Sequence, residues 1–469
     1  MWQHFGGQSG YTCRFSDRGS PRAMTAITDQ QADCLIFAQW IIPVTENGPV
    51  LTDHALAITG NKISAILPAA QARKLNAKKV LELPEHALMP GLINSHGHAA
   101  MSLFRGMADD LPLDIWLNDH IWPAEDKWVN EEFVRDGVNL AMAEMIRSGT
   151  TTFSDMYFFP NIAAKAATQA GMRTQLAFPV FEFPSAWGQN PDDYIHKGLQ
   201  VHDDHKHNPL VTVAFGPHAP YTVGDEAMNR IATLAAELHG GEINIQIHLH
   251  ESAFEVAQSE KEFSMRPIAR LAERGILGPR TQCVHLVSVN DEDIRTLADN
   301  NCHAIHCPES NMKLAAGFSP VQTMLDAGIN VALGTDGAAS NNTLNLFNEV
   351  RSAALLAKGL TGNAAALPDN VALEMATING ARAMGQDAEL GSLEVGKLAD
   401  LIAVDLSALE QQPVYNPISQ LVYTHVGSAV SYSWINGRMV MDNRRLTTLN
   451  INEIRERTQY WRHQISKES

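Results

Sequence analysis

Residues 88–98 read LMPGLINSHGH, an apolar run that ends in two histidines, His96 and His98. On an extended strand, side chains two positions apart point to the same face, so the two imidazoles converge on one point, as metal ligands must. Borderline-soft divalent metals such as zinc bind imidazole nitrogen readily. Pro90 and Gly91 form a turn signal that marks where the strand begins. A surface His-x-His pair in a loop is the alternative interpretation, and the rest of the chain decides between the two.

Three further segments each carry an apolar or β-branched run, then a histidine or an aspartate, then a loop: residues 243–251, 283–286 and 330–337. In a parallel α/β barrel such positions all fall at the C-terminal ends of the strands, on the face that carries active sites. A lone histidine at a strand end is usually structural, but several of them in barrel order indicate a shared site. The predicted metal ligands are His96, His98, His248 and Asp336.

The middle of the chain, residues 89–385, alternates short apolar strands with helical patterns. For example, residues 131–148 read as a helix that is followed by a strand at residues 150–155. This alternation is typical of βα units around a parallel sheet. The length suits one α/β domain, a metal-dependent (β/α)8 TIM barrel with loop insertions. Residues 109–125, rich in aromatic and carboxylate side chains, are predicted to form an inserted loop and helix over the barrel mouth.

The two ends of the chain are rich in short strands instead. The dipeptides Gly60-Asn61 and Asn436-Gly437 each separate two strand-like runs, and both are hairpin signals. We therefore predict one small β-sandwich domain built from residues 24–88 and 386–469, with a helix at the C-terminus. Residues 1–23 show no periodicity and precede a second methionine, so we interpret them as a disordered extension, either a mistaken start or a remnant of cloning.

The chain has 469 residues, 45% of them hydrophobic and 19% charged, and a formal net charge of −17. This composition fits a globular protein with ample length for a barrel core and a second small domain. The acidic balance disfavours nonspecific binding to nucleic acid or anionic membranes. No run of about 18 apolar residues is present, which argues against a membrane span. The five cysteines are odd in number and scattered, which favours reduced thiols and a cytoplasmic location.

Six motifs together resemble the amidohydrolase superfamily and, within its cytosine deaminase and chlorohydrolase branch, the 5-methylthioadenosine/S-adenosylhomocysteine deaminase family. The motifs are PGLINSHGH (90–98), GPHAPY (216–221), HLHE (248–251), HCPESNMKL (306–314), GTDG (334–337) and GSLEVGKLADL (391–401). The resemblance spans roughly residues 30 to 445. As a set, these motifs are very specific for the superfamily and less specific for the substrate.

The resemblance implies one divalent metal per subunit, zinc or alternatively iron, and a metal-activated water. It implies that Asp336 takes a proton from that water besides binding the metal. Glu251 follows His248 by three residues and is predicted to carry a proton to N1 of a purine as general acid/base; a helix N-cap or a surface carboxylate is its alternative role. His285 matches the family histidine that polarises the attacked carbon or orients the water, with a buried structural role as the alternative. His250 is predicted to be structural.

Superfamily members with two metals carry a carboxylated lysine near the end of the fourth barrel strand. We assign residues 173–180, RTQLAFPV, as that strand, and they contain no lysine. The resemblance therefore implies one metal and a deaminase-type reaction, rather than dihydroorotase-type or urease-type chemistry.

Trp116 and Glu125 match the tryptophan and the glutamate that line the nucleoside pocket of the methylthioadenosine family, and His218 matches a histidine near the substrate. A carboxylate such as Glu125 can accept two hydrogen bonds from a ribose 2′,3′-diol, which free bases and triazines lack. The alternatives are a packed amphipathic helix for Trp116 and a solvated position for Glu125. The family also uses arginines near the sugar or its 5′ substituent; residues 181–187 offer none, which leaves tolerance of a homocysteine tail open.

The predicted reaction is hydrolytic deamination of a 6-aminopurine nucleoside to the inosine analogue and ammonia. The foremost substrate is 5′-methylthioadenosine, with S-adenosylhomocysteine or adenosine as further candidates, and Glu251 and His285 are expected to contact it. A guanine, cytosine or triazine amidohydrolase with the same metal is the alternative. A noncatalytic assembly protein with the same barrel fold is a remote alternative, because such relatives should lose metal ligands. We expect a homo-oligomer without nucleic-acid or membrane partners.

Overall fold

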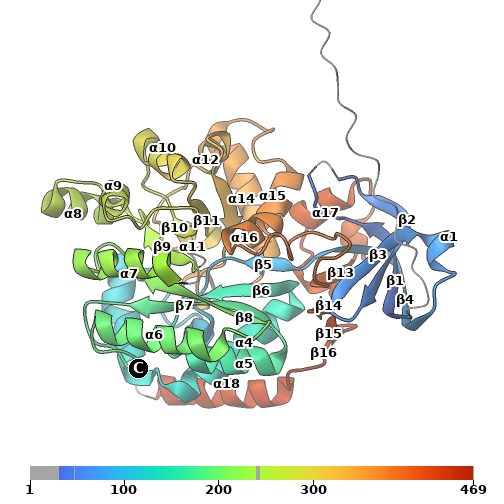
Figure 1. Ribbon diagram of the computed structural model, residues 1–469, viewed down its shortest axis with the longest axis horizontal. Coiled ribbons are helices and arrows are strands. Elements are labelled where there is room, and N and C mark those ends of the chain that lie inside the picture. The colour runs from blue at the N-terminus through green and yellow to red at the C-terminus, as the bar shows by residue number, and fades with distance from the viewer. Residues whose placement is uncertain (1–30, 47, 239–242, 468–469) are drawn as a thin grey trace, which may run out of the picture.

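The computed structural model describes residues 31–46, 48–238 and 243–467, so the extension predicted at residues 1–23 lies outside the described residues. Two eight-stranded sheets organise the chain (Figure 1). One sheet is parallel and closes into a barrel, and the other is mixed and combines strands from both chain ends. The predicted (β/α)8 barrel with a small β domain from both ends is confirmed. The domain boundaries stay a prediction.

The barrel strands neighbour one another in chain order. They are β5 (Leu92–Asn94), β6 (Thr150–Asp155), β7 (Arg173–Val180), β8 (Val211–Pro217), β9 (Ile245–Leu249), β10 (Thr281–His285), β11 (His303–His306) and β12 (Asn330–Leu333). The last strand meets the first, because Ser95 N donates a hydrogen bond to Leu333 O at 2.8 Å. This order corrects one assignment: residues 173–180 form the third barrel strand. The fourth is β8, which also contains no lysine.

Helices cover the outside of the barrel. Helix α4 (Glu131–Arg147) begins after Asn130, whose side chain accepts hydrogen bonds from two backbone N–H groups, and it leads into β6 as predicted. The helices after the later strands are α5 (Pro160–Ala170), α6 (Pro191–His205), α7 (Asp225–Glu237), α8 (Ala253–Phe263), α9 (Pro267–Glu273), α10 (Asp291–Asp299), α11 (Pro308–Lys313), α12 (Val321–Asp326), α13 (Ala338–Asn341), α14 (Leu346–Thr361), α15 (Asp369–Met375) and α16 (Ile378–Ala383).

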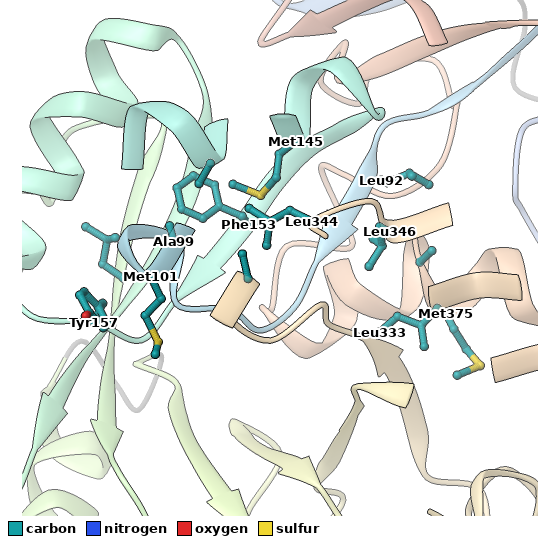
Figure 2. Close-up of a cluster of buried hydrophobic side chains, with 14 of the residues drawn as sticks. Leu92, Ala99, Met101, Met145, Phe153, Tyr157, Leu333, Leu344, Leu346 and Met375 are labelled. Carbon is teal, nitrogen blue, oxygen red and sulfur yellow. The ribbon is translucent and has the colours of Figure 1, made fainter. Parts of the chain in front are cut away.

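One continuous hydrophobic core lies between the barrel strands and these helices. Figure 2 shows part of it, where Leu92 of β5, Phe153 of β6 and Leu333 of β12 are buried together with Met145 of α4. Burial of apolar surface of this kind is the main favourable contribution to folding. The strands that carry the predicted ligands are therefore held by packing on their outer side.

The barrel interior contains a network of buried amides. Gln175 of β7 and Gln246 of β9 both donate to Gln282 Oε1 of β10, at 2.9 and 2.6 Å. Gln246 Nε2 also lies 3.0 Å from the carbonyl oxygen of Ser95. Because buried polar groups are costly unless they are paired, this network specifies the register of three strands just below the loop that carries His96.

The second sheet, which we call the end sheet, has the order β16-β15-β14-β13-β4-β1-β2-β3. Its central strand β4 pairs in parallel with β1 and antiparallel with β13, so late strands extend a sheet that early strands begin. The bounds are β1 (Ala32–Ile41), β2 (Leu51–Thr59), β3 (Lys62–Pro68), α1 (Ala69–Ala72), β4 (Ala77–Pro90), β13 (Leu401–Asp405), η4 (Leu409–Gln411), α17 (Pro417–Tyr423), η5 (Gly427–Ala429), β14 (Val430–Ile435), β15 (Arg438–Asp442) and β16 (Arg445–Leu446).

Both predicted hairpins are present in the end sheet, at the turns between β2 and β3 and between β14 and β15. The sheet folds over on itself, because Asn61 of the first turn donates to Asn436 Oδ1 of the second at 3.1 Å. Between the facing layers lies a separate apolar core that includes Ile36, Ile58 and Trp434. One hydrogen-bonded sheet thus provides the two layers of the predicted sandwich.

Two contacts fix the chain ends to the barrel. Arg173 of β7 and Asp400, which precedes β13, form an ion pair at 2.8 Å with both side chains only 4% exposed. Helix α18 (Ile451–Ser466) lies along α4, where Trp461 Nε1 donates to Asp136 Oδ2 at 2.9 Å. Within the described ranges, no helix has the length and apolar character needed to cross a membrane.

The insertion after β5 forms helical segments over the barrel mouth. They are η1 (Ala99–Phe104), α2 (Leu113–Ile115), the π-helical turn η2 (Trp116–Ile121) and α3 (Trp122–Trp128). We call residues 113–128 the lid. Trp116 is buried, whereas Ile115 is exposed, so the lid turns one side toward the barrel and the other toward solvent.

Candidate active site

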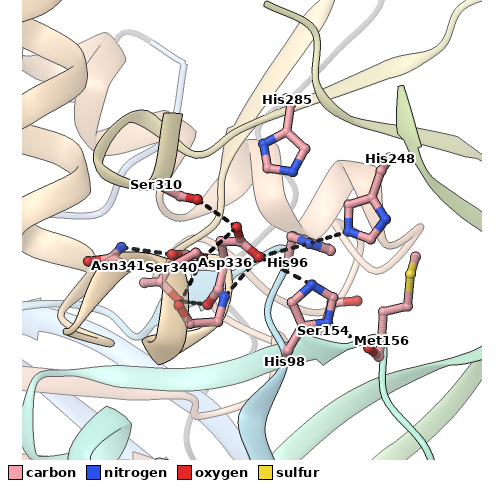
Figure 3. Close-up of polar contacts among 12 residues, drawn as sticks. His96, His98, Ser154, Met156, His248, His285, Ser310, Asp336, Ser340 and Asn341 are labelled. Atoms are coloured by element: carbon pink, nitrogen blue, oxygen red, sulfur yellow. Dashed lines mark hydrogen bonds and ion pairs between the residues drawn. The ribbon is translucent and has the colours of Figure 1, made fainter. Parts of the chain in front are cut away.

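The predicted ligands come together at the C-terminal ends of three barrel strands (Figure 3). His96 and His98 follow β5, His248 lies in β9 and Asp336 follows β12. The Nε2 atoms of His96 and His248 are 3.1 Å apart. Asp336 Oδ1 lies 3.5 Å from His96 Nε2 and 3.2 Å from His98 Nε2. Residues separated by up to 240 positions thus face one small volume.

Each of the three histidines is held through its other ring nitrogen. His96 Nδ1–H donates to Gln246 Oε1 at 2.9 Å. His98 Nδ1–H donates to the Met156 carbonyl, and His248 Nδ1–H donates to the His218 carbonyl, both at 2.7 Å. These bonds fix the tautomer that leaves each Nε2 with a free lone pair.

The donor set fits a divalent metal. With both rings held at Nδ1, the lone pairs of His96 and His248 face each other across 3.1 Å, an arrangement that repels unless a cation balances it. The Asp336 carboxylate adds negative charge at the same point. Imidazole nitrogen with carboxylate oxygen is a donor set of catalytic zinc sites.

Asp336 is positioned by three hydrogen bonds. Its Oδ2 accepts from the hydroxyls of Ser310 at 2.6 Å and Ser340 at 2.8 Å, and its Oδ1 accepts from Gly337 N at 2.8 Å. The residue also has a φ of 60°, in the left-handed region that aspartate adopts more readily than most residues. The short loop after β12 is therefore shaped to point this carboxylate at the histidines.

Glu251 and His285 form a second pair beside the ligands. Glu251 Oε1 lies 3.7 Å from His285 Nε2, and His285 Nδ1–H donates to Asn311 Oδ1 at 2.8 Å. Burial and, to a smaller extent, the charge of Asp336 raise the pKa of Glu251 to about 8. A carboxyl group with such a pKa holds a proton near neutral pH and can donate it.

His250 has a different environment. Its Nδ1–H donates to the Ser288 carbonyl at 3.0 Å, and its Nε2 accepts from Ile268 N at 3.2 Å. Its φ of 54° turns it away from the alternation that places His248 in the site. The contacts of this histidine are those of a structural residue.

A cavity opens beside this cluster and below the lid. It brings together Trp116, Glu125, His218, Glu251 and His285, the residues predicted to contact a substrate. His98, His248 and Asp336 line it as well, whereas His96 is fully buried behind them. Burial raises the pKa of Glu125 to about 7, against a smaller lowering by the Tyr157 hydroxyl and His98.

Several contributing residues are not among the predicted ones. Gln246 and Asn311 orient His96 and His285, and Ser310 and Ser340 orient Asp336. Gln246 carried a signal, because it lies two positions before His248 on one strand and so shares its face. Asn311 and Ser310 lie inside a quoted motif without an assigned role.

The role of Gln246 gives a first testable expectation. Gln246→Met removes the acceptor of His96 Nδ1–H, so the ring loses its fixed tautomer, and we expect metal affinity to fall roughly 10- to 100-fold. Gln175→Met, in the same amide network but without contact to His96, is the matched control. Competition with a fluorescent chelator measures both. Equal metal affinities in the two variants would show that the amide network as a whole, and not the contact to His96, determines metal binding.

A parallel eight-stranded barrel with histidines and an aspartate gathered at its strand ends defines a metal-dependent hydrolase. The chain belongs to the amidohydrolase family, whose model matches residues 87–440. It is 52% identical to the 5-methylthioadenosine/S-adenosylhomocysteine deaminase of Saccharophagus degradans, over 92% of this chain and 97% of that protein.

Solved structures agree with this assignment. An adenosine deaminase from Xanthomonas campestris with bound zinc is 42% identical, with a TM-score of 0.91 over 93% of this chain and 99% of that one. The atrazine chlorohydrolase TrzN from Arthrobacter aurescens, complexed with zinc, is 25% identical, with a TM-score of 0.85 over 91% of this chain and 99% of that one.

Proposed function

We propose that this protein deaminates 6-aminopurine nucleosides, foremost 5′-methylthioadenosine, with S-adenosylhomocysteine and adenosine as further candidates. The products are the inosine analogue and ammonia. The observation that carries this proposal is the placement of Glu251 and His285 beside the four predicted ligands, at the floor of a cavity that Trp116 and Glu125 also line. The names of the relatives support the same substrates.

His96, His98, His248 and Asp336 would hold one divalent metal, for which we propose zinc with iron as the alternative. Such a metal supplies Lewis acidity that lowers the pKa of a water to about 7. Asp336, whose Oδ2 is fixed by two serines, is placed to accept a proton from that water.

The remaining steps use the chain's own groups. Glu251 donates a proton to N1 of the purine as water adds to C6 and gives one proton to Asp336. Asp336 then passes that proton to the exocyclic amine, the bond between C6 and this nitrogen breaks, and ammonia leaves. The remaining hydroxyl proton returns to Glu251, so that C6 becomes a carbonyl. His285, held through Nδ1 by Asn311, directs its Nε2 into the cavity and orients the water. His218 lines the cavity wall, with its Nδ1 against Thr222 Oγ1 at 2.9 Å.

Two lid residues would bind the nucleoside. The indole N–H of Trp116 is buried and has no hydrogen-bond partner among the described residues, so it is available to a substrate acceptor. The Glu125 carboxyl lines the same cavity and would accept both hydroxyls of the ribose diol.

An ammonia-release screen of the purified enzyme tests this function. The panel is adenosine, 5′-methylthioadenosine, S-adenosylhomocysteine, guanine, cytosine and a chlorotriazine. We expect release from the nucleosides only. Ammonia release from a free base alone, or chloride release from the chlorotriazine, would favour a guanine, cytosine or triazine amidohydrolase. A metal-free chain without any turnover would favour a noncatalytic assembly protein.

Ribose recognition by Glu125 has its own test. Hydrogen bonds to a charged group contribute about 1.5–3 kcal/mol each, so we expect Glu125→Gln to lower kcat/KM for 5′-methylthioadenosine at least tenfold. Any weak activity on adenine should change little, because adenine has no diol. Paired kinetics on both compounds provide the measurement. Equal losses on both, or no loss on the nucleoside, would contradict ribose recognition.

A cytoplasmic location and assembly into a homo-oligomer are also proposals. The four described cysteines are buried and unpaired, which supports a reducing compartment. Light scattering coupled to size-exclusion chromatography would measure the assembly.

A further inference from the structure

We infer that the cavity selects nucleosides with an uncharged, apolar 5′ substituent and discriminates strongly against the zwitterionic homocysteine tail. This inference rests on the proposed function and narrows its substrate class. The relatives are named for two substrates, and these differ only in that tail: a methylthio group in one, and a thioether chain ending in an ammonium and a carboxylate in the other. The chemistry of the cavity wall therefore decides between them.

The wall beyond the polar cluster is apolar. Leu113, Leu117, Ile121 and Trp122 of the lid face the cavity together with Phe158 and Phe181. Among the described residues, none that lines the cavity is a lysine or an arginine. The carboxylates and histidines there are assigned above to the metal, the proton transfer, the water and the ribose, apart from His218, whose Nδ1 lies against Thr222 Oγ1. No cation on this wall can pair with a substrate carboxylate.

Aromatic rings continue this apolar wall toward solvent. Phe158 stacks on Phe181 with 6.0 Å between centroids, Phe181 lies 4.9 Å from Phe183, and Phe183 lies 6.1 Å from Trp122 of the lid. Phe183 is 40% exposed, so the row of rings reaches the surface. A tail that leaves the cavity along this row meets hydrocarbon rather than a polar partner.

Lys313, next in the sequence to a residue of the cavity wall, is already paired. Lys313 precedes Leu314 of the cavity wall, but its Nζ donates to Asp109 Oδ1 at 2.7 Å, to the Ala339 carbonyl at 3.1 Å and to Asn342. The lid itself carries Asp114 and Asp119, both exposed. Neither of them offers a cation to the substrate carboxylate.

The two 5′ substituents therefore differ in their free energy of binding to this wall. A methylthio or longer alkylthio group gains from burial against leucine and aromatic side chains. The carboxylate of the homocysteine tail loses hydration against the same wall without finding a cation there, which is costly. Discrimination should thus follow charge and not length.

The test compares three substrates of the metal-loaded enzyme: 5′-methylthioadenosine, S-adenosylhomocysteine and 5′-butylthioadenosine. The butylthio compound matches the length of the homocysteine tail without its charges. We expect kcat/KM for S-adenosylhomocysteine to be at least 100-fold below that for 5′-methylthioadenosine, and the butylthio compound to lie within tenfold of the latter. Calorimetric affinities for 5′-methylthioinosine and S-inosylhomocysteine should show the same order without turnover.

A rim variant tests the cause. Phe183→Arg supplies a cation on the exposed end of the aromatic row and should raise the ratio of S-adenosylhomocysteine to 5′-methylthioadenosine turnover at least tenfold. Phe183→Met, of similar size without charge, should leave the ratio within twofold. An unchanged ratio in Phe183→Arg would overturn the claim that the missing cation at this rim disfavours S-adenosylhomocysteine.

The outcomes separate this inference from the proposed function. Turnover of S-adenosylhomocysteine within tenfold of 5′-methylthioadenosine, or a butylthio compound as poor as S-adenosylhomocysteine, would overturn the inference while nucleoside deamination stands. Failure to deaminate any of the three nucleosides would overturn the proposed function itself.

Discussion

Asp336→Ala is expected to abolish turnover and to lower the metal content of the purified protein, and His248→Ala should do the same. Each variant removes one of the four predicted donor atoms, and both His248 Nε2 and Asp336 Oδ1 lie within 3.5 Å of His96 Nε2. The metal is therefore held more weakly and the water loses its fixed position. For Asp336 the loss is double, because the same carboxylate is proposed to accept the water proton. Mass spectrometry of bound metal and ammonia release would be measured on the same preparations.

A matched control for these variants is His250→Asn. His250 is a neighbouring strand-end histidine whose contacts point away from the site, and asparagine tolerates its left-handed backbone. We expect this variant to retain the metal. A stoichiometric metal and full activity in Asp336→Ala or His248→Ala would refute the ligand assignment.

Glu251→Gln should lose roughly 10²–10⁴-fold in kcat while it retains the metal, as is typical for loss of a general acid/base. Glutamine has nearly the same shape as glutamate but cannot deliver a carboxyl proton. The position of Glu251, 3.7 Å from His285 Nε2 and lining the cavity, carries this expectation. Steady-state kinetics combined with metal analysis provide the measurement.

Glu251→Asp separates the need for a titratable carboxyl group from the need for its exact position. It keeps a titratable carboxyl group but shortens its reach, so we expect activity between wild type and Glu251→Gln. Near-normal turnover of Glu251→Gln would show that the residue is structural, although the N-cap of the following helix is Ser252 and not Glu251.

Much of the site could be predicted because the ends of parallel strands converge whatever the loops between them do. A histidine at the end of an apolar run, such as His96 or His248, is predicted from the local sequence pattern to lie at the end of a strand. The same holds for Asp336, which follows β12 directly. The alternation of strands and helices likewise predicted the barrel fold without any knowledge of long-range contacts.

The rank of residues 173–180 among the barrel strands was predicted wrongly. The strands β6, β7 and β8 are all largely buried, so composition indicates that a strand is present but does not give its place in the barrel. Only the pairing partners show that β7 is the third strand after β5 and β6.

Orienting residues were harder to foresee, because their role depends on pairs far apart in the sequence. Gln246 meets His96 across 150 positions, and Asn311 meets His285 across 26. A buried glutamine within a strand has no sequence signature that distinguishes a network member from a partner of a ligand. The side-chain geometry of the site therefore required the structure.

The central place of β4 in the end sheet has a consequence for biosynthesis. β1 and β4 leave the ribosome early, whereas β13, which covers the other edge of β4, leaves it after all eight barrel strands. Throughout that interval the nascent chain presents an unpaired strand edge, the kind of surface that recruits other chains. Translation that stops before residue 401 would release a chain that has all eight barrel strands but leaves this edge of β4 uncovered and prone to aggregation.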